Sequence, residues 1–408
     1  MIRFAKILAG ALGAIVLASC GGAGDVSPPV APAPFNQMVT FGDSLSDVGT
    51  YKVGTIAAVG GGQFTVNAAA SKNWTELIAA KLGLPVPCAA QTGFSPLIPG
   101  FTGAATANNT ACRNYAQGSA RVTSPYGPSS KAIQDFVFNA NLSSGATAAS
   151  ATTAAANAAP LGFTALPVVN QINNHLAVVG GSFSNKDLVL VLAGGNDVFL
   201  NLGGVGPAAG GGPGAAAAAF LAGWTVAQQQ AVAAGGAPAV QAAQAAAVQG
   251  MTRAGEELAG YVKTLIVAKG AKFVAVVNLP DIAQTPLAAG FDAPTRGFVN
   301  QLGNSFNGAL QAGLANTPGV IIVDAYTQGR TQIASPAAFG LVNVTDRACS
   351  TTSSANPLGG ASITCTTAST IATDTSRYQF ADDVHLTPYG NQLLAGFVLS
   401  RIVAPDGR

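Results

Sequence analysis

Residues 37–47 read Gln-Met-Val-Thr-Phe-Gly-Asp-Ser-Leu-Ser-Asp, a short apolar run followed by a polar turn that carries serine. The run predicts a buried strand over 37–41. A serine just beyond a strand lies at the edge of a sheet, where its hydroxyl is accessible and its own amide can face a developing oxyanion. On spacing alone, however, Ser44 fits a turn or a helix N-cap better than a nucleophile.

Three further apolar runs resemble the first one. Together the four runs predict buried parallel strands over 37–41, 188–193, 273–278 and 320–324. Helical patterns separate or follow them over 74–82, 251–269, 297–312 and 388–402. This alternation predicts an α/β sandwich with a mostly parallel sheet.

Composition narrows the function classes. The chain has 408 residues, of which 49% are hydrophobic and 9% charged, with a formal net charge of +2. It can therefore bury a large core, and it lacks the basic surface that a nucleic-acid partner would require. Only two histidines occur, His175 and His385. A His-rich metal site is thereby excluded, and we expect neither a metal nor a cofactor.

The N-terminal residues have the pattern of an export signal. Basic residues precede an apolar run over 7–18, which is too short to span a bilayer. Residues 17–20, Leu-Ala-Ser-Cys, resemble the lipobox of bacterial lipoproteins; a plain cleaved signal is the alternative. We expect a signal over 1–20 and a Pro/Gly-rich tether over 21–36. Lipidated Cys20 would anchor the exported protein to a membrane, and the glycine after it indicates the bacterial outer membrane. The cell surface or the periplasm is the alternative location.

The remaining cysteines form an even set, as an oxidising compartment favours. They are Cys88, Cys112, Cys349 and Cys365. Three pairings are possible, and we favour Cys88 with Cys112 and Cys349 with Cys365, because each closes a short loop. Four buried thiols are the alternative. No Cys-x-x-Cys occurs, so a zinc knuckle is not supported.

A base for the serine is found near the other end of the chain. Asp382 precedes His385 by three residues, a spacing that lets both side chains emerge from one turn on the same side. The imidazole could take a proton from serine while the carboxylate fixes its tautomer. His175 has no acidic neighbour, so we interpret it as a structural histidine, satisfied or at the surface.

Two further stretches could stabilise an oxyanion. Residues 193–197, Ala-Gly-Gly-Asn-Asp, follow a predicted strand, so Asn196 would share the sheet edge with Ser44. An Asn-Asp turn is the alternative. Residues 114–120, Asn-Tyr-Ala-Gln-Gly-Ser-Ala, offer backbone amides of small residues that could complete the oxyanion hole.

Taken in this order, the four blocks resemble the SGNH, or GDSL, family of serine hydrolases, and most closely its bacterial phospholipase/lecithinase/haemolysin-like esterases. The resemblance runs from about Val39 to Ala395. It implies a flavodoxin-like, three-layer α/β/α domain over 37–408 and metal-independent ester hydrolysis through an acyl-enzyme. It also implies roles for individual residues: Ser44 as nucleophile, His385 as base, Asp382 as its partner and Asn196 as oxyanion donor.

The chain departs from the pattern of that branch at a few positions. Gly118 and Ser119 stand where the branch usually has two glycines, so either amide could be the second oxyanion donor, with Gly118 favoured. Leu386 replaces a proline, and Thr50 stands where asparagine is common. These differences concern the geometry of loops and leave the three catalytic candidates in place.

Several functions remain open at this stage. The leading hypothesis is an esterase, lipase or phospholipase-like enzyme acting on a lipid or acyl ester. An acetyl-sugar esterase or an acyltransferase of the same family is the first alternative, and a non-catalytic surface lipoprotein is the second. Ala/Gly-rich insertions near 145–160 and 203–250 fit a surface loop and a weak helix, or a lid. We expect the pocket to be built from loops around 90–110, 145–180 and 203–250.

Overall fold

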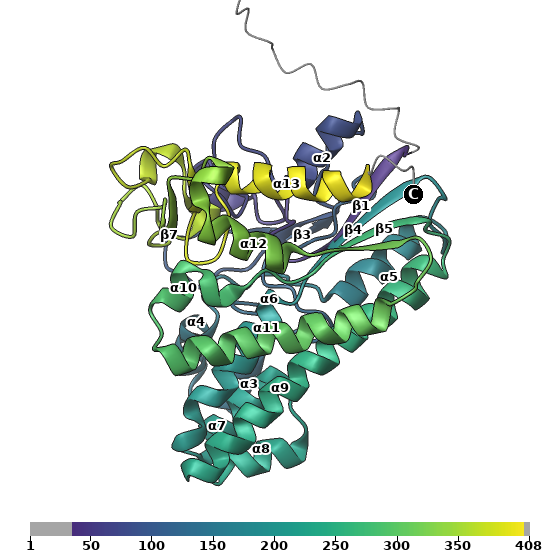
Figure 1. Cartoon of the computed structure of the whole chain (residues 1–408). Helices are drawn as coiled ribbons and strands as arrows, with labels where there is room; N and C mark the ends of the chain where they lie inside the picture. Colours follow the sequence, from purple (N-terminus) through teal and green to yellow (C-terminus); the bar gives the residue numbers. More distant parts are fainter. Residues whose placement is uncertain (1–34, 404–408) are drawn as a thin grey trace, which may run out of the picture. The chain divides into compact units, whose positions relative to one another are not determined.

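The computed structural model describes residues 35–403 (Figure 1). The predicted signal, Cys20 and nearly all of the tether lie outside these residues. The strands are β1 (Gln37–Gly42), β2 (Gln91–Phe94), β3 (Ala104–Asn108), β4 (Asp187–Leu192), β5 (Phe273–Val277), β6 (Val320–Val323), β7 (Asn343–Arg347) and β8 (Tyr378–Phe380). The helices are α1 (Gly54–Ala58), α2 (Trp74–Leu82), α3 (Lys131–Ser143), α4 (Ala148–Ala158), α5 (Val168–Val178), α6 (Gly195–Val205), α7 (Gly212–Ala222), α8 (Val226–Ala233), α9 (Gly236–Tyr261), α10 (Pro286–Ala289), α11 (Ala293–Leu314), α12 (Ala325–Ala334) and α13 (Pro388–Ile402).

A parallel sheet in the order β1-β4-β5-β6 forms the centre of the fold. Its strands are the four predicted ones, each within a residue or so of the expected limits. On the free edge of β1, Thr40 donates to the Arg113 carbonyl and accepts from the Tyr115 amide, so this segment pairs as a short parallel extension. With that extension the spatial order is the doubly wound order of flavodoxin-like proteins.

Helices cover both faces of the sheet, which makes three layers (Figure 1). Val39, Phe41 and their counterparts in β4 and β5 face one core, which includes residues of α5, α9 and α11. Met38 and the alternate positions of the same strands face the other core, which includes residues of α2 and α13. This alternation follows from the two-residue period of a strand, and it confirms the predicted α/β fold class.

The Ala-rich insertions are helical. Residues 145–160 contain α4, which begins at the N-cap Thr147 and buries Ala151 and Ala155. Residues 203–250 contribute α7, α8 and half of α9, and their alanines join the core beside α5 and α11. The helix predicted over 251–269 therefore covers only the second part of α9 and the π-helical turn, Val262–Val267, that continues it. Alanine is the strongest helix former, so a run of alanines extends a helix rather than ending it.

Candidate active site

Ser44 lies in a tight turn at the carboxyl end of β1. Gly42 has a φ of +150°, and a Cβ there would lie 2.0 Å from the Leu192 carbonyl oxygen, so only glycine fits beside β4. Asp43 then donates its amide to that carbonyl and accepts from the Leu45 amide at 3.1 Å. No helix begins at this point, so Ser44 is a turn residue rather than a helix N-cap.

His385 lies in the turn between β8 and α13 and contacts Ser44. Its Nε2 is 2.8 Å from Ser44 Oγ, and its Nδ1 is 2.8 Å from Asp382 Oδ1. Asp382 Oδ1 also accepts from the backbone amides of Val384 and His385 at 3.1 and 2.9 Å. The carboxylate thus fixes both the turn and the ring, and the three predicted side chains form one chain of contacts.

The charges in this turn favour an ionised carboxylate beside an imidazole of high proton affinity. Burial alone would raise the pKa of Asp382, but the facing His385 and hydrogen bonds from His385 and Ser362 hold that pKa well below its usual range. Burial alone would lower the pKa of His385, but the charge and hydrogen bond of Asp382, with Asp43 and Asp383 adding to them, raise it. Such an imidazole accepts a proton readily from a neighbouring hydroxyl.

Asp43, the residue before Ser44, is a second buried carboxyl group at the site. It is 2% exposed, and burial raises its pKa to about 7, against the opposing effects of the Leu45 amide and of His385. It therefore titrates near neutral pH.

Asn196 lies on the first turn of α6, directly after β4, as the sequence predicts. Gly194 precedes it with a φ of +118°, which turns the chain sharply out of the strand. The carboxamide of Asn196 donates to the Ala120 carbonyl at 2.8 Å. An amide nitrogen carries two N–H groups, so the second one remains for a ligand near Ser44.

Gly118 and Ser119 differ in what their amides contact. The Gly118 N–H donates to Asp47 Oδ2 at 2.9 Å, whereas the Ser119 N–H has no acceptor among residues 35–403. Ser119 has a φ of +69°, the left-handed conformation that favours glycine. The Gln117 amide donates to the Gly42 carbonyl at 3.1 Å, which joins the loop of Gly118 and Ser119 to the end of β1. Neither Gly118 nor Ser119 lines the cavity beside Ser44.

A largely apolar cavity of about 100 Å³ opens beside Ser44, Asn196 and His385. Its apolar wall includes Leu45, Phe199, Leu279, Ile282, Ile333 and Phe380. These residues follow the carboxyl ends of β1, β4, β5 and β6 or come from β8. The expectation of a pocket built from 90–110, 145–180 and 203–250 is wrong, because those segments pack elsewhere and line no part of this cavity. Neither insertion therefore covers the cavity as a lid in this structure.

His175 is buried away from these groups. It is 0% exposed and packs against the rings of Phe41, Tyr115 and Phe183, so it is not at the surface. Its ring nitrogens have no hydrogen-bond partner in the described part of the chain, so it is not satisfied either. Burial, with the nearby charge of Arg113, lowers the pKa of His175 to about 4, so it stays neutral at ordinary pH.

The structure contains both predicted disulfides, Cys88–Cys112 and Cys349–Cys365. Cysteines paired in this way indicate maturation in an oxidising compartment. Within residues 35–403, no helix is long and apolar enough to cross a membrane. Nor does that part of the chain bring together three or more His, Cys, Asp or Glu side chains that could hold a metal ion.

Sequence reasoning missed three residues beside the site. Asp47 binds the Gly49, Thr50 and Gly118 amides, Phe64 lies with its ring centroid 4.9 Å from that of His385, and Ser362 contacts Asp382. Asp47 stands inside the stretch quoted first, where an aspartate two residues before Gly49 is a turn signal. For Phe64 and Ser362 we find no local signal.

A parallel α/β fold with a hydroxyl, an imidazole and a carboxylate in line at the carboxyl edge of its sheet has the parts that acyl transfer requires. Residues 38–397 match the family model of the GDSL-like lipases and acylhydrolases. The chain therefore belongs to this family and is a hydrolase acting on carboxylic esters. No curated protein matches the chain.

Proposed function

We propose that this hydrolase is a serine esterase or lipase that uses Ser44 as nucleophile, His385 as general base and Asp382 to orient the base. The observation that carries the proposal is the 2.8 Å contact of His385 Nε2 with Ser44 Oγ, with Asp382 Oδ1 2.8 Å from the other ring nitrogen. An imidazole held between an acid and a hydroxyl in this way can move a proton in both directions.

The reaction would proceed in two steps. Ser44 Oγ attacks the ester carbonyl carbon while His385 Nε2 takes the hydroxyl proton. The tetrahedral intermediate collapses, and the same nitrogen returns that proton to the departing alcohol, which leaves an acyl group on Ser44. Water then repeats the sequence: His385 takes a proton from the water, hydroxide adds to the acyl carbon, and the acid leaves as Ser44 regains its proton.

For the oxyanion hole, we assign the Ser44 amide, the second N–H of Asn196 and the Ser119 amide. The occupied amide of Gly118 favours Ser119 over the Gly118 assignment that the sequence suggested, because an N–H that already donates to a buried carboxylate is not free for an oxyanion. Preorganised donors of this kind stabilise charge that develops only in the transition state.

The cavity favours an apolar acyl or lipid ester, since it is lined mainly by aliphatic and aromatic side chains. A phospholipid with the same acyl chain is within this substrate class, as the resemblance to phospholipase-like relatives suggests. No particular observation favours an acetyl sugar, transfer of the acyl group to an alcohol other than water, or binding without catalysis. We retain the proposal of an exported, lipid-anchored protein, which the two disulfides support only as far as the oxidising compartment.

The test combines a covalent probe with a series of substrates. A fluorophosphonate should label the wild-type protein at Ser44, and Ser44→Ala should lose both labelling and ester hydrolysis. Ser46→Ala is the matched control, because Ser46 is fully buried in the same turn and has no catalytic role here. Retained hydrolysis in Ser44→Ala would reject the assignment. With p-nitrophenyl esters of rising chain length and a phospholipid, a rate that peaks at acetyl would reject the lipid substrate.

A further inference from the structure

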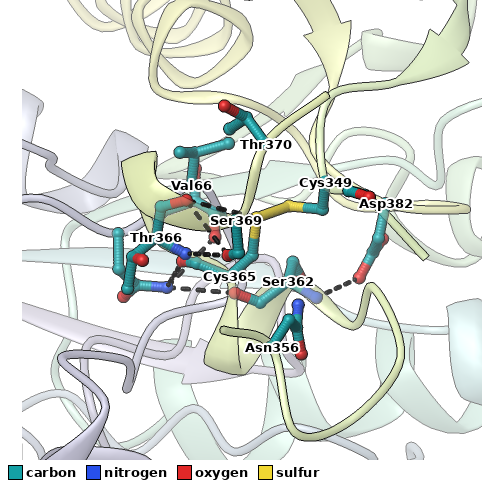
Figure 2. Close-up of a disulfide and its surroundings, with 12 residues drawn as sticks. Val66, Cys349, Asn356, Ser362, Cys365, Thr366, Ser369, Thr370 and Asp382 are labelled. Carbon is teal, nitrogen blue, oxygen red and sulfur yellow. Dashed lines mark hydrogen bonds between the residues drawn. A yellow bond between two sulfur atoms is a disulfide. The ribbon is translucent and has the colours of Figure 1, made fainter. Parts of the chain in front are cut away.

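Figure 2 shows the disulfide Cys349–Cys365 and the residues around it. The segment that this disulfide closes contains Ser362, which is fully buried. The Ser362 amide donates to Asp382 Oδ2 at 2.9 Å, and its Oγ is 3.2 Å from His385 Nδ1. Ser362 therefore contacts both members of the acid–base pair, on the side of the imidazole away from Ser44.

The two half-cystines lie on either side of this contact. The Cys349 amide donates at 2.8 Å to the carbonyl of Ala381, the residue just before Asp382. Cys365 follows Ser362 by three residues. Asn67 Nδ2 donates to the backbone carbonyls of Ser362 and Cys365, each at 3.0 Å. The disulfide thus connects Cys349, which bonds the backbone just before Asp382, with the turn that carries Ser362. Both of its cysteines are fully buried.

The geometry suits stabilisation of an ion pair. The Ser362 amide points at the carboxylate, while the hydroxyl oxygen lies beside Nδ1, the nitrogen that faces Asp382. An N–H aimed at a negative group and an oxygen beside a positive one favour the charged forms of both partners. The other charged groups facing His385 are Asp43 and Asp383, and Asp383 is itself paired with Arg347.

We propose that Ser362 is a positioning residue that holds the His385 ring and the Asp382 carboxylate in the orientation that lets His385 contact Ser44. We propose also that the Cys349–Cys365 disulfide keeps Ser362 in place. The inference rests on the proposed function, since it assigns Ser362 a part in the same reaction. Ser362 does not touch the substrate, and its effect reaches the reaction only through the imidazole and the carboxylate.

Kinetics provide the first test. Ser362→Ala removes the hydroxyl but keeps the backbone N–H, and it should lower kcat about 10-fold with little change in KM, because one hydrogen bond to a charged pair is lost. Ser362→Thr retains a hydroxyl and should restore most of the rate. Ser369→Ala is the matched control: Ser369 is equally buried, its hydroxyl bonds only Thr366, and its loss should leave kcat unchanged.

A second readout does not depend on activity. The chain has two histidines, and the low pKa of His175 separates its titration from that of His385, so NMR of the imidazole rings can follow His385 alone. In Ser362→Ala, His385 should titrate at lower pH than in the wild type. In Ser362→Thr and Ser369→Ala, its titration should stay where it is in the wild type. The double variant Cys349→Ser/Cys365→Ser should show the same shift as Ser362→Ala, whereas Cys88→Ser/Cys112→Ser should not.

The outcomes separate the two proposals. If Ser362→Ala titrates like wild type, or if Ser369→Ala shifts His385 equally, the positioning role is rejected even in an active esterase. If the wild-type protein hydrolyses no ester but Ser362→Ala still shifts His385, the proposed function fails while the coupling of Ser362 to His385 stands.

Discussion

His385 Nε2 lies 2.8 Å from Ser44 Oγ although 341 positions separate the two residues in the sequence. β1 delivers Ser44 to the carboxyl edge of the sheet, and the turn between β8 and α13 brings His385 back over that edge. The contact depends on Asp382, which binds both the ring and the backbone of the same turn. Loss of the carboxylate should therefore disturb charge and geometry together.

The pH dependence of hydrolysis follows from the raised pKa of His385. A general base must be neutral, so kcat/KM should fall as the pH drops through a pKa above the ordinary value of about 6.5. Asp382→Asn removes the main cause of the shift, so the acid limb should move to lower pH and kcat should fall by about 10⁴-fold. Asp383→Asn is the control and should change the acid limb and kcat only slightly. The measurement is a pH–rate profile of each variant. An acid limb that stays in place in Asp382→Asn would contradict the prediction.

Stability depends on the same group with the opposite sign. A raised pKa means that the folded state binds the proton more tightly than the unfolded chain does. The contribution of His385 to the free energy of unfolding is therefore complete below its unfolded pKa and is lost as the pH rises through its folded pKa. We expect the enzyme to gain activity over the range in which it loses this stabilisation, which parallel denaturation and rate measurements against pH can show.

Asn196 should act on turnover more than on binding. Removal of one oxyanion donor by Asn196→Ala should lower kcat by about 10²- to 10³-fold. Asn201 is a matched control in the same helix, because it is 1% exposed, bonds Trp224 and lies outside the cavity wall. Asn201→Ala should lower the denaturation midpoint and keep kcat. If the two variants lose equal activity, Asn196 has no oxyanion role.

Asp47 should control the oxyanion loop. Its carboxylate accepts from the Gly49, Thr50 and Gly118 amides at 2.8 to 2.9 Å. Asp47→Ala would release the Gly118 amide and let the loop around Ser119 move, so we expect kcat to fall at least about 10-fold. Asp187→Ala tests for mere loss of stability, because this buried carboxylate bonds Gln37 and the Ser184 amide at the opposite end of the sheet. An Asp47→Ala enzyme with full kcat would contradict the assignment of Ser119.

Much of this fold and site is readable from local sequence. Apolar runs mark the four central strands, and the residues after two of them, Ser44 and Asn196, share an edge because parallel strands end on the same side. The Asp382–His385 spacing is equally local. These features are short patterns whose geometry is set within one strand or turn, so they survive without knowledge of the rest of the chain.

Other features depend on distant packing and could not be read in this way. Ser362 reaches the site because Asn67, 295 residues away, and a disulfide hold its turn. The cavity wall comes from segments that follow β1, β4, β5 and β6 and from β8, and a sequence does not show which of these segments will lie beside the site. Low complexity also misled over 145–160, where it suggested a surface loop, whereas helix propensity formed α4. The Ala-rich insertion over 203–250, expected as a weak helix, forms α7, α8 and the first part of α9, with a buried face.

That insertion should support the oxyanion loop through Arg121. The guanidinium donates to Asp197 at 2.8 Å and to the carbonyls of Leu221 and Ala222, at the end of α7, at 2.9 Å. Arg121 is buried. Arg121→Ala would leave Asp197 as an uncompensated buried charge, which should cost about 3–5 kcal/mol of unfolding free energy. Arg253 is the less buried counterpart, donating to the Gly223 carbonyl beside the same helix end. Arg253→Ala should change the denaturation curve little, and equal losses would place the effect outside the buried pair.

The cavity should set the acyl preference. Ile333 lies on α12 in the cavity wall, so Ile333→Trp would fill space that an acyl chain occupies in our proposal. We expect the ester chain length of maximal kcat/KM to become shorter, with fluorophosphonate labelling of Ser44 retained, because the reacting groups are untouched. Val226→Trp is the control for added bulk, since Val226 is 67% exposed on α8 and absent from the cavity wall. An unchanged chain-length profile in Ile333→Trp would mean that the acyl group binds outside this cavity.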